Sequence, residues 1–446
     1  MPIVVDRSGD VRVMNKKEIG VGLLGFGTIG SGVVSALQNQ GDLIASRTGL
    51  RLVLRRIADI DVARDRGVPL AKGMLTRDAA AVVASPDVNI VIELVGGVQA
   101  ARDLTIQALR LGKPVITANK ALLAEHGDEI FQLAEEHKTN VFFEASVGGG
   151  IPLIRSLREG LVSNRIQSIY GILNGTCNYI LTRMEQDRFS FDKAVRDAQK
   201  AGYAEAEPAL DIDGIDTAHK AVILASLAYG FHIPMSSVAV QGIRGFNAMD
   251  VSYALDLGYR IKMLAVIKEY NGEVEIRVHP TLIPLNHILA SVHGVFNAVL
   301  IEGDGVGNVL CYGQGAGRDS TASAVLSDVV DAARDLVCHV ARRAPGFILY
   351  NPAGRIRDIG ASEVRYYLRL TLLDKPGVFG QIGAVLGRHG ISIASLLQKE
   401  VQAGKHVPVI VITHHAREQA FRAAVEEIDV MKIVGAKTIC FRIEDF

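Results

Sequence analysis

The chain of 446 residues has no tryptophan, only four cysteines and no excess of either charge. Its 48 basic residues balance its 48 acidic ones, and neither sign forms a long run, which argues against a nucleic-acid partner. Cys177, Cys311, Cys338 and Cys440 lie far apart without metal-ligand spacing, as expected for reduced core cysteines. No apolar run approaches the roughly 18 residues of a membrane span, and no signal segment opens the chain. We therefore expect a soluble, cytoplasmic protein with no membrane partner.

The first third of the sequence alternates apolar strand-like runs with helical periodicity. Strand-like runs lie at 19–30, 50–61 and 88–97, a strand followed by a loop is predicted at 114–120, a further strand with a glycine-rich exit at 140–150, and helices between them. Such alternation is typical of a parallel, doubly wound α/β sheet. We predict a Rossmann-type domain over 18–145, to which 312–343 returns.

Gly25, Gly27 and Gly30 form a G-x-G-x-x-G motif between the first strand and the first helix, the context in which this motif indicates dinucleotide binding. The loop, with Phe26, Thr28 and Ile29, is expected to hold the pyrophosphate at the helix N-terminus. Asp59 is placed to bind the ribose hydroxyls of NAD. Arg55, Arg56 and Arg64 are close enough in sequence to hold the 2′-phosphate of NADP, so both cofactors remain open.

The remaining chain divides into three further parts. Residues 146–311 mix helices and strands, which predicts an α+β domain; we expect this domain to bind the substrate and to form the dimer contact. A linker rich in proline and glycine follows at 344–361. Residues 362–446 have the βαββαβ order of a ferredoxin-like unit.

The segment AGYAEAEPALDIDGIDTAHK, residues 201–220, combines five carboxylates with one lysine, Lys220. Asp216 and Lys220 have the spacing of an ordinary helical ion pair. The following residues, 221–231, are apolar around the whole helix, which predicts that the pair lies where a helix enters the core. A buried lysine–carboxylate pair is a candidate functional site, because burial and a neighbouring charge both shift pKa values.

Five motifs carry a resemblance to homoserine dehydrogenase over essentially the whole chain: GFGTIG, TANKALLA, FEASVGGGIPLI, NGTCNYIL and the acidic segment above. The C-terminal unit, with LLDKPGVFGQIGAVLGRHGISI, resembles the ACT domain of the long, monofunctional form. The resemblance implies NAD(P)-dependent interconversion of L-aspartate 4-semialdehyde and L-homoserine, on the route to threonine, methionine and isoleucine.

The resemblance also implies roles for particular residues. Glu205 and Asp211 would hold the substrate ammonium, and Asn174, Gly175, Thr176 and Tyr203 would surround its carboxylate. Hydride addition leaves an alkoxide that needs a proton, so Lys220 is the expected donor and Asp216 would orient it. Lys120, in TANK, is expected beside the nicotinamide or is a solvated lysine at a strand end. The sequence does not decide which lysine transfers the proton.

Three further sites follow from the same resemblance. Glu144, Val147, Gly149 and Ile151 would hold a monovalent cation, Na⁺, unless Glu144 only caps backbone groups. Gly315, in GQGAG, would close over the cofactor or only turn the chain. Gly377 begins a helix where the ACT domain would bind L-threonine between paired units of a homodimer or homotetramer. Deleting all residues after Gly360 would then leave an active enzyme that ignores threonine.

Two other classes remain possible on sequence grounds. A different ACT-bearing dehydrogenase, of the 2-hydroxy-acid or prephenate type, would generally use a histidine base. His126, His219 and the pair at 414–415 have no metal spacing and are interpreted as ordinary histidines. A non-catalytic amino-acid sensor would be expected to lose Asp216 or Lys220, and both are present.

Overall fold

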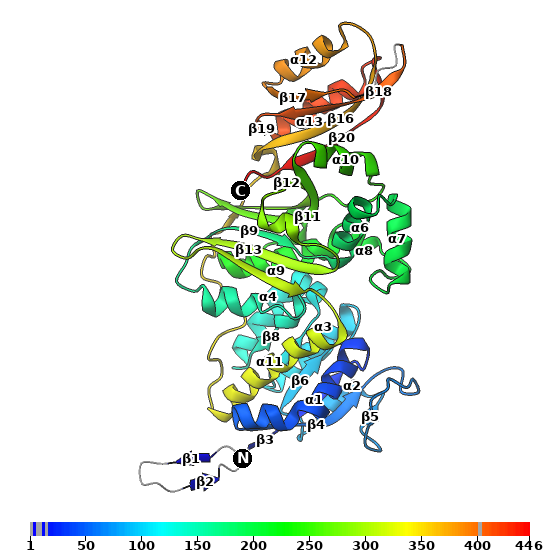
Figure 1. Ribbon diagram of the computed structural model, residues 1–446. Coiled ribbons are helices and arrows are strands. Elements are labelled where there is room, and N and C mark those ends of the chain that lie inside the picture. The colour runs from blue at the N-terminus through cyan, green and yellow to red at the C-terminus, as the bar shows by residue number, and fades with distance from the viewer. Residues whose placement is uncertain (1–2, 6–10, 14–16, 400–403) are drawn as a thin grey trace.

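The computed structural model describes residues 3–5, 11–13, 17–399 and 404–446. In Figure 1 the chain rises from a parallel sheet near the N-terminus, through a second sheet, to a third unit at the opposite end. A short antiparallel pair, β1 (Ile3–Val5) and β2 (Val11–Val13), precedes the first sheet. No helix within the described ranges is long and apolar enough to span a membrane.

The first sheet is parallel throughout, with strand order β5-β4-β3-β6-β7-β8. Its strands are largely buried, because helices cover both faces. The prediction of a doubly wound α/β sheet is confirmed. The elements are β3 (Lys17–Leu24), α1 (Thr28–Thr48), β4 (Leu50–Ala58), β5 (Leu75–Thr76), α2 (Ala79–Ala84), β6 (Ile90–Glu93), α3 (Gln99–Arg110), β7 (Val115–Thr117), α4 (Lys120–Glu136) and β8 (Val141–Phe142).

A helix from much later in the chain completes this layer. Helix α11 (Arg318–Val337) packs beside α1 on one face of the parallel sheet, and its alanines and valines share a core with β3. Helices α2, α3 and α4 bury their apolar side chains in a different cluster, on the other face.

The second sheet is antiparallel through β14-β13-β9-β11-β12. Helix α5 (Leu153–Arg155) precedes these strands, and between them run α6 (Gly175–Gln186), α7 (Phe191–Lys200), α8 (Ala209–Ile212), α9 (Ile215–Tyr229) and α10 (Ala248–Asp256). The strands are β9 (Ile166–Ile172), β10 (Ala239–Val240), β11 (Tyr259–Tyr270), β12 (Glu273–Pro284), β13 (Phe296–Gly303) and β14 (Gly307–Gln314).

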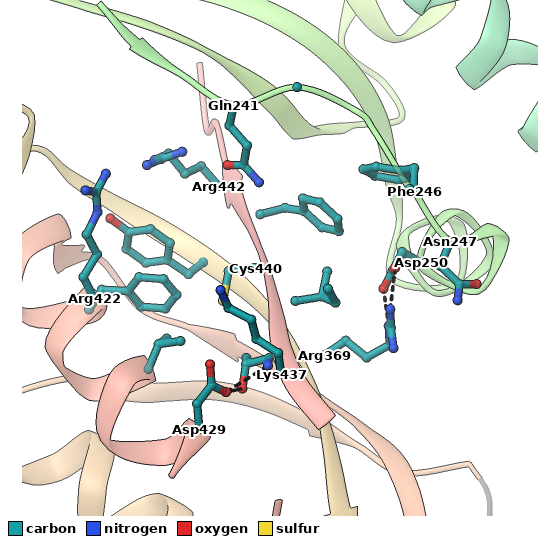
Figure 2. A pocket seen from close by; sticks show the side chains of 18 of the residues that line it. Gln241, Phe246, Asn247, Asp250, Arg369, Arg422, Asp429, Lys437, Cys440 and Arg442 are labelled. Atoms are coloured by element: carbon teal, nitrogen blue, oxygen red, sulfur yellow. Dashed lines mark hydrogen bonds and ion pairs between the residues drawn. The ribbon is translucent and has the colours of Figure 1, made fainter. Parts of the chain in front are cut away.

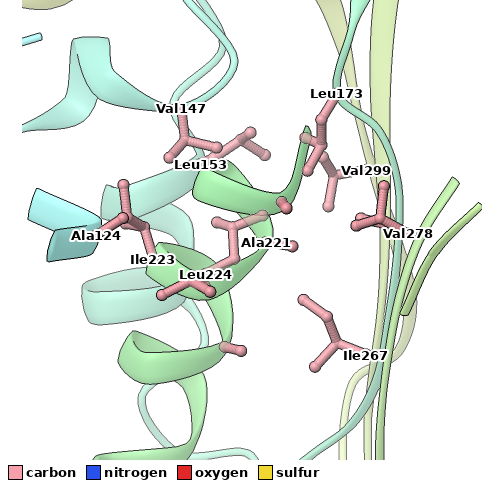
Figure 3. Packing of buried hydrophobic residues seen from close by; sticks show 14 of the residues in the cluster. Ala124, Val147, Leu153, Leu173, Ala221, Ile223, Leu224, Ile267, Val278 and Val299 are labelled. Carbon is pink, nitrogen blue, oxygen red and sulfur yellow. The ribbon is translucent and has the colours of Figure 1, made fainter. Parts of the chain in front are cut away.

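Helix α9 is the buried helix that the apolar run predicted. Figure 3 shows its Ala221 and Leu224 facing Ile267 and Val278 of the second sheet, while Ala124 of α4 lies on the other side. Asp216 and Lys220 therefore stand on the first turns of a helix held between the two sheets. Gly214, with φ of +87°, begins this helix in the left-handed conformation that suits glycine.

The third unit has the predicted order β16-α12-β17-β18-α13-β20, with strand order β20-β16-β18-β17. It comprises β16 (Glu363–Leu373), α12 (Val378–Arg388), β17 (Ile393–Leu397), β18 (His406–Thr413), β19 (Ala416–Arg417), α13 (Glu418–Asp429) and β20 (Val434–Ile443), and β15 (Arg355–Ile356) precedes it. This is the ferredoxin-like arrangement expected from the sequence.

The third unit is joined to the second more closely than a linker and a separate domain would suggest. The end of β20 pairs with β12, so that the two sheets are continuous. Tyr367, Phe441 and Ile443 belong to the same buried cluster as α9. Glu444, just beyond β20, accepts hydrogen bonds from Lys268 and Arg277. The expectation that residues after Gly360 can be removed cleanly is therefore revised.

Candidate active site

The glycine loop between β3 and α1 has the shape that a pyrophosphate requires. Gly25 has φ of +90°, and a Cβ there would lie 2.4 Å from the Leu94 carbonyl oxygen. A Cβ on Gly30 would lie 2.1 Å from the carbonyl oxygen of Gly25, so helix and loop touch. Gly27 has no heavy atom within 4 Å of a built Cβ, and no side chain caps the helix that follows. The free N–H groups of α1 and the open space at Gly27 fit a dinucleotide phosphate.

Asp59 lies beside this loop, but its carboxylate is already engaged. One oxygen accepts the N–H of Phe26 at 2.6 Å, and the other accepts from Asp61 and from Arg66. The Arg66 guanidinium also lies over the Phe26 ring and donates to the Phe26 carbonyl. Arg66 is the positive charge at this position, whereas the sequence had suggested Arg55, Arg56 or Arg64. Arg55 instead pairs with Glu18.

Asp216 joins the two candidate lysines. Lys220 donates to Asp216 Oδ2 at 2.7 Å, and Lys120 approaches Asp216 Oδ1 at 3.1 Å. Lys220 also donates to the Leu173 carbonyl oxygen at 2.6 Å. Burial alone would raise the pKa of Asp216, but the charges of Lys220 and Lys120 and the hydrogen bonds outweigh it and lower the pKa. Asp216 is therefore an anion that fixes both lysines.

Asn174 connects this cluster to the acidic segment. Its amide nitrogen donates to Asp211 at 2.7 Å and to Asp216 at 2.9 Å, while its oxygen caps α6 by accepting the N–H of Cys177. Resemblance had placed Asn174 at the substrate carboxylate, yet in this structure its amide orients two carboxylates. Nothing in the sequence pattern distinguished this role, because Asp211 and Asp216 are some forty positions away.

The other predicted substrate residues surround the cluster at different depths. Gly175 opens α6, and a Cβ there would lie 2.8 Å from the Val295 carbonyl oxygen, so the close approach requires glycine. Thr176 donates to the carbonyl oxygen of Tyr203, whose half-exposed ring tilts against Tyr179. Glu205 lies exposed on the same turn, with its side chain toward solvent.

The segment predicted to hold a cation is folded around a helix cap. Both carboxylate oxygens of Glu144 accept backbone N–H groups, from Ile154 and Arg155, at 2.9 Å. Burial raises the pKa of Glu144, and these backbone hydrogen bonds oppose the rise. The Glu144 carboxylate thus caps backbone groups, with one N–H on each of its oxygens. The carbonyls of Val147, Gly149 and Ile151 belong to the turn that follows.

In the part of the chain that the structure describes, no cluster of three or more His, Cys, Asp or Glu side chains is arranged for a metal. Burial lowers the pKa of His219, which lies on α9 next to Lys220, and the charge of Lys120 acts in the same direction. The four cysteines are all unpaired thiols.

The glycine loop 313–317 links the two sheets near the cofactor cradle. A Cβ on Gly149 would lie 2.6 Å from the Gly315 carbonyl, so these two glycines are in contact. Arg318, at the start of α11, donates to the side chain and carbonyl of Ser31 in α1. Gly315 therefore lies between the glycine turn at 148–150 and the start of the dinucleotide-binding helix.

A dinucleotide cradle beside two lysines held by one buried carboxylate can reduce a carbonyl group or oxidise an alcohol. The phosphates of a bound dinucleotide would lie at α1, and the two lysines can stabilise negative charge on the reacting oxygen and protonate it. The fold and site thus define an NAD(P)-dependent dehydrogenase that carries an ACT domain.

Comparison with known proteins specifies this class. The family model "Homoserine dehydrogenase, NAD binding domain" matches residues 25–144, "Homoserine dehydrogenase" matches 152–330, and "ACT domain" matches 366–430. A homoserine dehydrogenase of Pseudomonas aeruginosa is 41% identical over 435 residues, covering 96% of this chain and 99% of the relative. One of Synechocystis is 43% identical over 424 residues, covering 93% and 96%.

Solved structures agree. A homoserine dehydrogenase from Thiobacillus denitrificans superposes with a TM-score of 0.91 at 42% identity, covering 96% of this chain and 99% of that one. A hyperthermophilic archaeal homoserine dehydrogenase in complex with NADPH has a TM-score of 0.62 at 27% identity, covering 71% and 98%. The chain belongs to the homoserine dehydrogenase family and is an NAD(P)-dependent oxidoreductase with that activity.

Proposed function

We propose that Lys220 delivers the proton when this enzyme reduces L-aspartate 4-semialdehyde to L-homoserine, and that Asp216 positions both lysines. The observation that supports this is the hydrogen bonding of Lys220. Two of the three N–H groups of an ammonium are taken by Leu173 and Asp216, which leaves one for the substrate oxygen. Lys120 is more exposed, with 37% of its side chain accessible against 11% for Lys220.

The reaction then needs few groups from the chain. A bound reduced nicotinamide supplies the hydride to the aldehyde carbon. Lys220 gives its proton to the oxygen on which negative charge develops, and regains one from solvent. Lys120 adds positive charge beside the same oxygen. The negative charge of Asp216 attracts both ammonium groups and so offsets their mutual repulsion. In the reverse direction Lys220 must first lose a proton to solvent, and the neutral amine then removes the hydroxyl proton of homoserine as the hydride passes to the oxidised nicotinamide.

The substrate's own charges would be held by the turn above this cluster. Asp211, oriented by Asn174, and the exposed Glu205 are the two carboxylates that we assign to the substrate ammonium group. The N-terminus of α6, at Gly175 and Thr176, offers backbone N–H groups to the substrate carboxylate, beside Tyr203. Glu205 reaches the ligand only if its turn folds inward over the site.

We infer that NADP(H) is the better cofactor. The two oxygens of Asp59 are occupied, and Arg66 neutralises its charge. A neutralised carboxylate does not repel a 2′-phosphate, and Arg66 supplies an adjacent cation. The archaeal relative bound to NADPH is consistent with this. A lower kcat/KM with NADP⁺ than with NAD⁺ would contradict it.

A cation site at 144–151 is retained only as a main-chain site. Since Glu144 is engaged in capping, Na⁺ would be held by the carbonyls of Val147, Gly149 and Ile151. Its binding would order the turn that contacts Gly315. Thermal unfolding in NaCl and in choline chloride of equal ionic strength would test this, since bound Na⁺ raises Tm.

We propose that the ACT domain binds L-threonine beside Gly377 and lowers activity. A cavity of about 290 Å³ at this turn is lined by Lys375, Gly377 and Gln398. Gly377, with φ of +88°, begins α12 without a side-chain cap, so N–H groups of the first turn beyond Val378 can receive a carboxylate. Threonine inhibits only if it binds the less active conformation better.

The contact between the ACT domain and the catalytic domain offers a route for such coupling. Figure 2 shows the cleft between them, about 520 Å³, with Asp250 of α10 paired to Arg369 of β16. Phe246 stacks on Phe441 across the cleft. Arg244, two residues before Phe246, donates to Asp213. Asp213 in turn lies two residues after Asp211, which we propose binds the substrate ammonium.

A homo-oligomer is proposed from exposed apolar side chains. Val162, Ile348 and Tyr350 are exposed and line one groove beside β11 and β12. Apolar patches of this kind mark interfaces in soluble proteins. The mass in solution, measured by light scattering, tests whether the chain is a dimer or a tetramer.

The central test compares two lysine variants in NADP⁺ reduction by L-homoserine. Lys220→Ala should lower kcat by about 10²–10⁴, the range for a positioned acid or base, with little change in the KM for cofactor. Lys120→Ala should lower kcat less. Near-normal turnover in Lys220→Ala, with a large loss in Lys120→Ala, would reassign the proton transfer to Lys120.

A further inference from the structure

Asn297, in β13, is a buried amide whose hydrogen-bonding groups are unused. It is 1% exposed, and neither its Oδ1 nor its Nδ2 has a hydrogen-bond partner among the described residues. Folding normally pairs such groups, because a buried polar group that has left water without a partner destabilises the protein. An amide that is buried at this cost is a candidate for a group whose partner arrives with a ligand or a conformational change.

The side chain of Asn297 lies directly against the loop that contains Gly315. A Cβ on Gly315 would lie 2.0 Å from Asn297 Cγ, 2.1 Å from Nδ2 and 2.3 Å from Oδ1. No other residue type fits at 315 while the amide keeps this place. Gly149 contacts Gly315 in turn, so the amide, the loop and the 148–150 turn lie in succession.

Asn297 also adjoins the strand end that holds Lys220. Its neighbour Ala298 is paired with Ile172, and the next residue, Leu173, supplies the carbonyl that accepts from Lys220. On the other side of Asn297, the Val295 carbonyl touches Gly175. The amide therefore lies between the loop beside the cofactor cradle and the turn beside the proton donor.

The loop is well suited to receive this amide. Residues 315–317 connect β14 to α11, and Arg318 ties the start of α11 to Ser31 in the dinucleotide-binding helix. Glycine at 315 and 317 leaves backbone N–H and C=O groups without a side chain to cover them. An asparagine amide offers one donor group and one acceptor, which matches the two kinds of backbone group.

We propose that Asn297 is a positioning residue for the 315–317 loop. When cofactor binds at α1, the loop shifts and its backbone forms hydrogen bonds with the Asn297 amide, which fixes the loop between the nicotinamide end and Lys220. The unpaired amide makes the free enzyme less stable, and pairing it makes the cofactor-bound arrangement more favourable. The proposal depends on cofactor binding at α1, which the NAD-binding family match supports independently of the assignment of Lys220.

Asn297→Leu tests this by replacing the amide with an apolar group of similar size, and Asn297→Ala is the second variant. Since no partner is lost, the Tm of the free enzyme should be unchanged or higher. The rise in Tm that NADPH produces should shrink, and the KM for cofactor should increase about 5- to 100-fold, the range expected for one or two lost hydrogen bonds. The KM for homoserine should change less.

Asn178→Leu is the matched control. Asn178 is equally buried, but its amide donates to the Val292 and Phe296 carbonyls and accepts from Lys262. Its replacement leaves those groups unpaired and should lower the Tm of the free enzyme.

Three results would overturn the proposal. An unchanged KM for cofactor in both Asn297 variants would show that the amide does not act on the loop. If the Asn297 variants lower the Tm of the free enzyme as much as Asn178→Leu does, the amide is already paired in the free enzyme, through a buried water, and stabilises the fold. That result would overturn the proposal whatever the KM for cofactor. Failure of both variants to fold would also overturn the proposal, because it would show that the free enzyme needs this side chain in order to fold.

Discussion

Replacing Glu444 by glutamine should destabilise the enzyme strongly, although the residue is two positions from the C-terminus. Glu444 is 2% exposed and accepts from Lys268 at 2.6 Å and from Arg277 at 2.8 Å. Arg277 is fully buried and also pairs with Glu275. The buried members of this group, Lys268, Arg277, Glu275 and Glu444, carry two positive and two negative charges, and the partly exposed Arg357 approaches Glu275 at 3.8 Å from outside it. Glutamine keeps the shape but leaves one positive charge in excess.

The magnitude follows from this count. Removing one partner of a buried ion pair costs about 3–5 kcal/mol. Lys268 is 19% exposed and can turn toward water, so the lower end of that range, about 3 kcal/mol, is expected. For a domain of about 150–250 residues, a loss of 1 kcal/mol in the free energy of unfolding lowers Tm by about 2–4 °C. The Tm of the unit that contains Glu444 should therefore fall by about 6–12 °C. Glu427→Gln, which breaks an exposed pair with Arg388 and His389, is the control and should leave Tm unchanged.

The pH dependence of the Tm difference between the wild type and Glu444→Gln gives a second check. Burial would raise the pKa of Glu444, but Arg277 and Lys268 outweigh it and lower the pKa below the ordinary glutamate value. A lowered pKa in the folded state stabilises the protein above the unfolded pKa, near 4.3, and the stabilisation is lost as pH falls through the folded pKa. The Tm gap between wild type and Glu444→Gln should therefore narrow below about pH 4. A gap that is absent at pH 7, or that widens in acid, would refute this reasoning.

Three further predictions concern the substrate, the cofactor and the domain boundary. Glu205→Gln should raise the KM for homoserine more than it lowers kcat, because the ammonium contact exists in ground and transition states alike; an unchanged KM would leave Glu205 as a solvated side chain. Gly27→Ala should keep the wild-type Tm, since nothing lies within 4 Å of the new methyl, yet raise the KM for cofactor, whereas Gly25→Ala should lower Tm because its methyl meets the Leu94 carbonyl. Deleting the residues after Gly360 should give an unstable protein, because the deletion removes Phe441 and Ile443 from the core around α9. A stable, active product that ignores threonine would show that the first two domains fold without the ACT domain.

The sequence alone was sufficient for the main elements of the three units and for the chemistry carried by short motifs, although not for the strand pair β1 and β2. The period of the apolar residues identified the parallel sheet, the buried helix α9 and the βαββαβ unit, since these patterns depend on neighbours a few positions apart. The spacing of Gly25, Gly27 and Gly30 and the one-turn separation of Asp216 from Lys220 are local in the same way. Resemblance between several such motifs was enough to indicate the family.

Only the tertiary structure decided how residues distant in the sequence combine. In the folded chain Lys120 pairs with the second carboxylate oxygen of Asp216, and the Asn174 amide donates to Asp211 and Asp216. Asp59 forms an ion pair with Arg66. The fold also brings Glu444 into contact with Arg277 of β12, and the Asn297 side chain into contact with Gly315. Each of these contacts joins segments whose local patterns are independent of each other. Which buried charges and amides meet is fixed by strand pairing and helix packing, and periodicity carries no information about that.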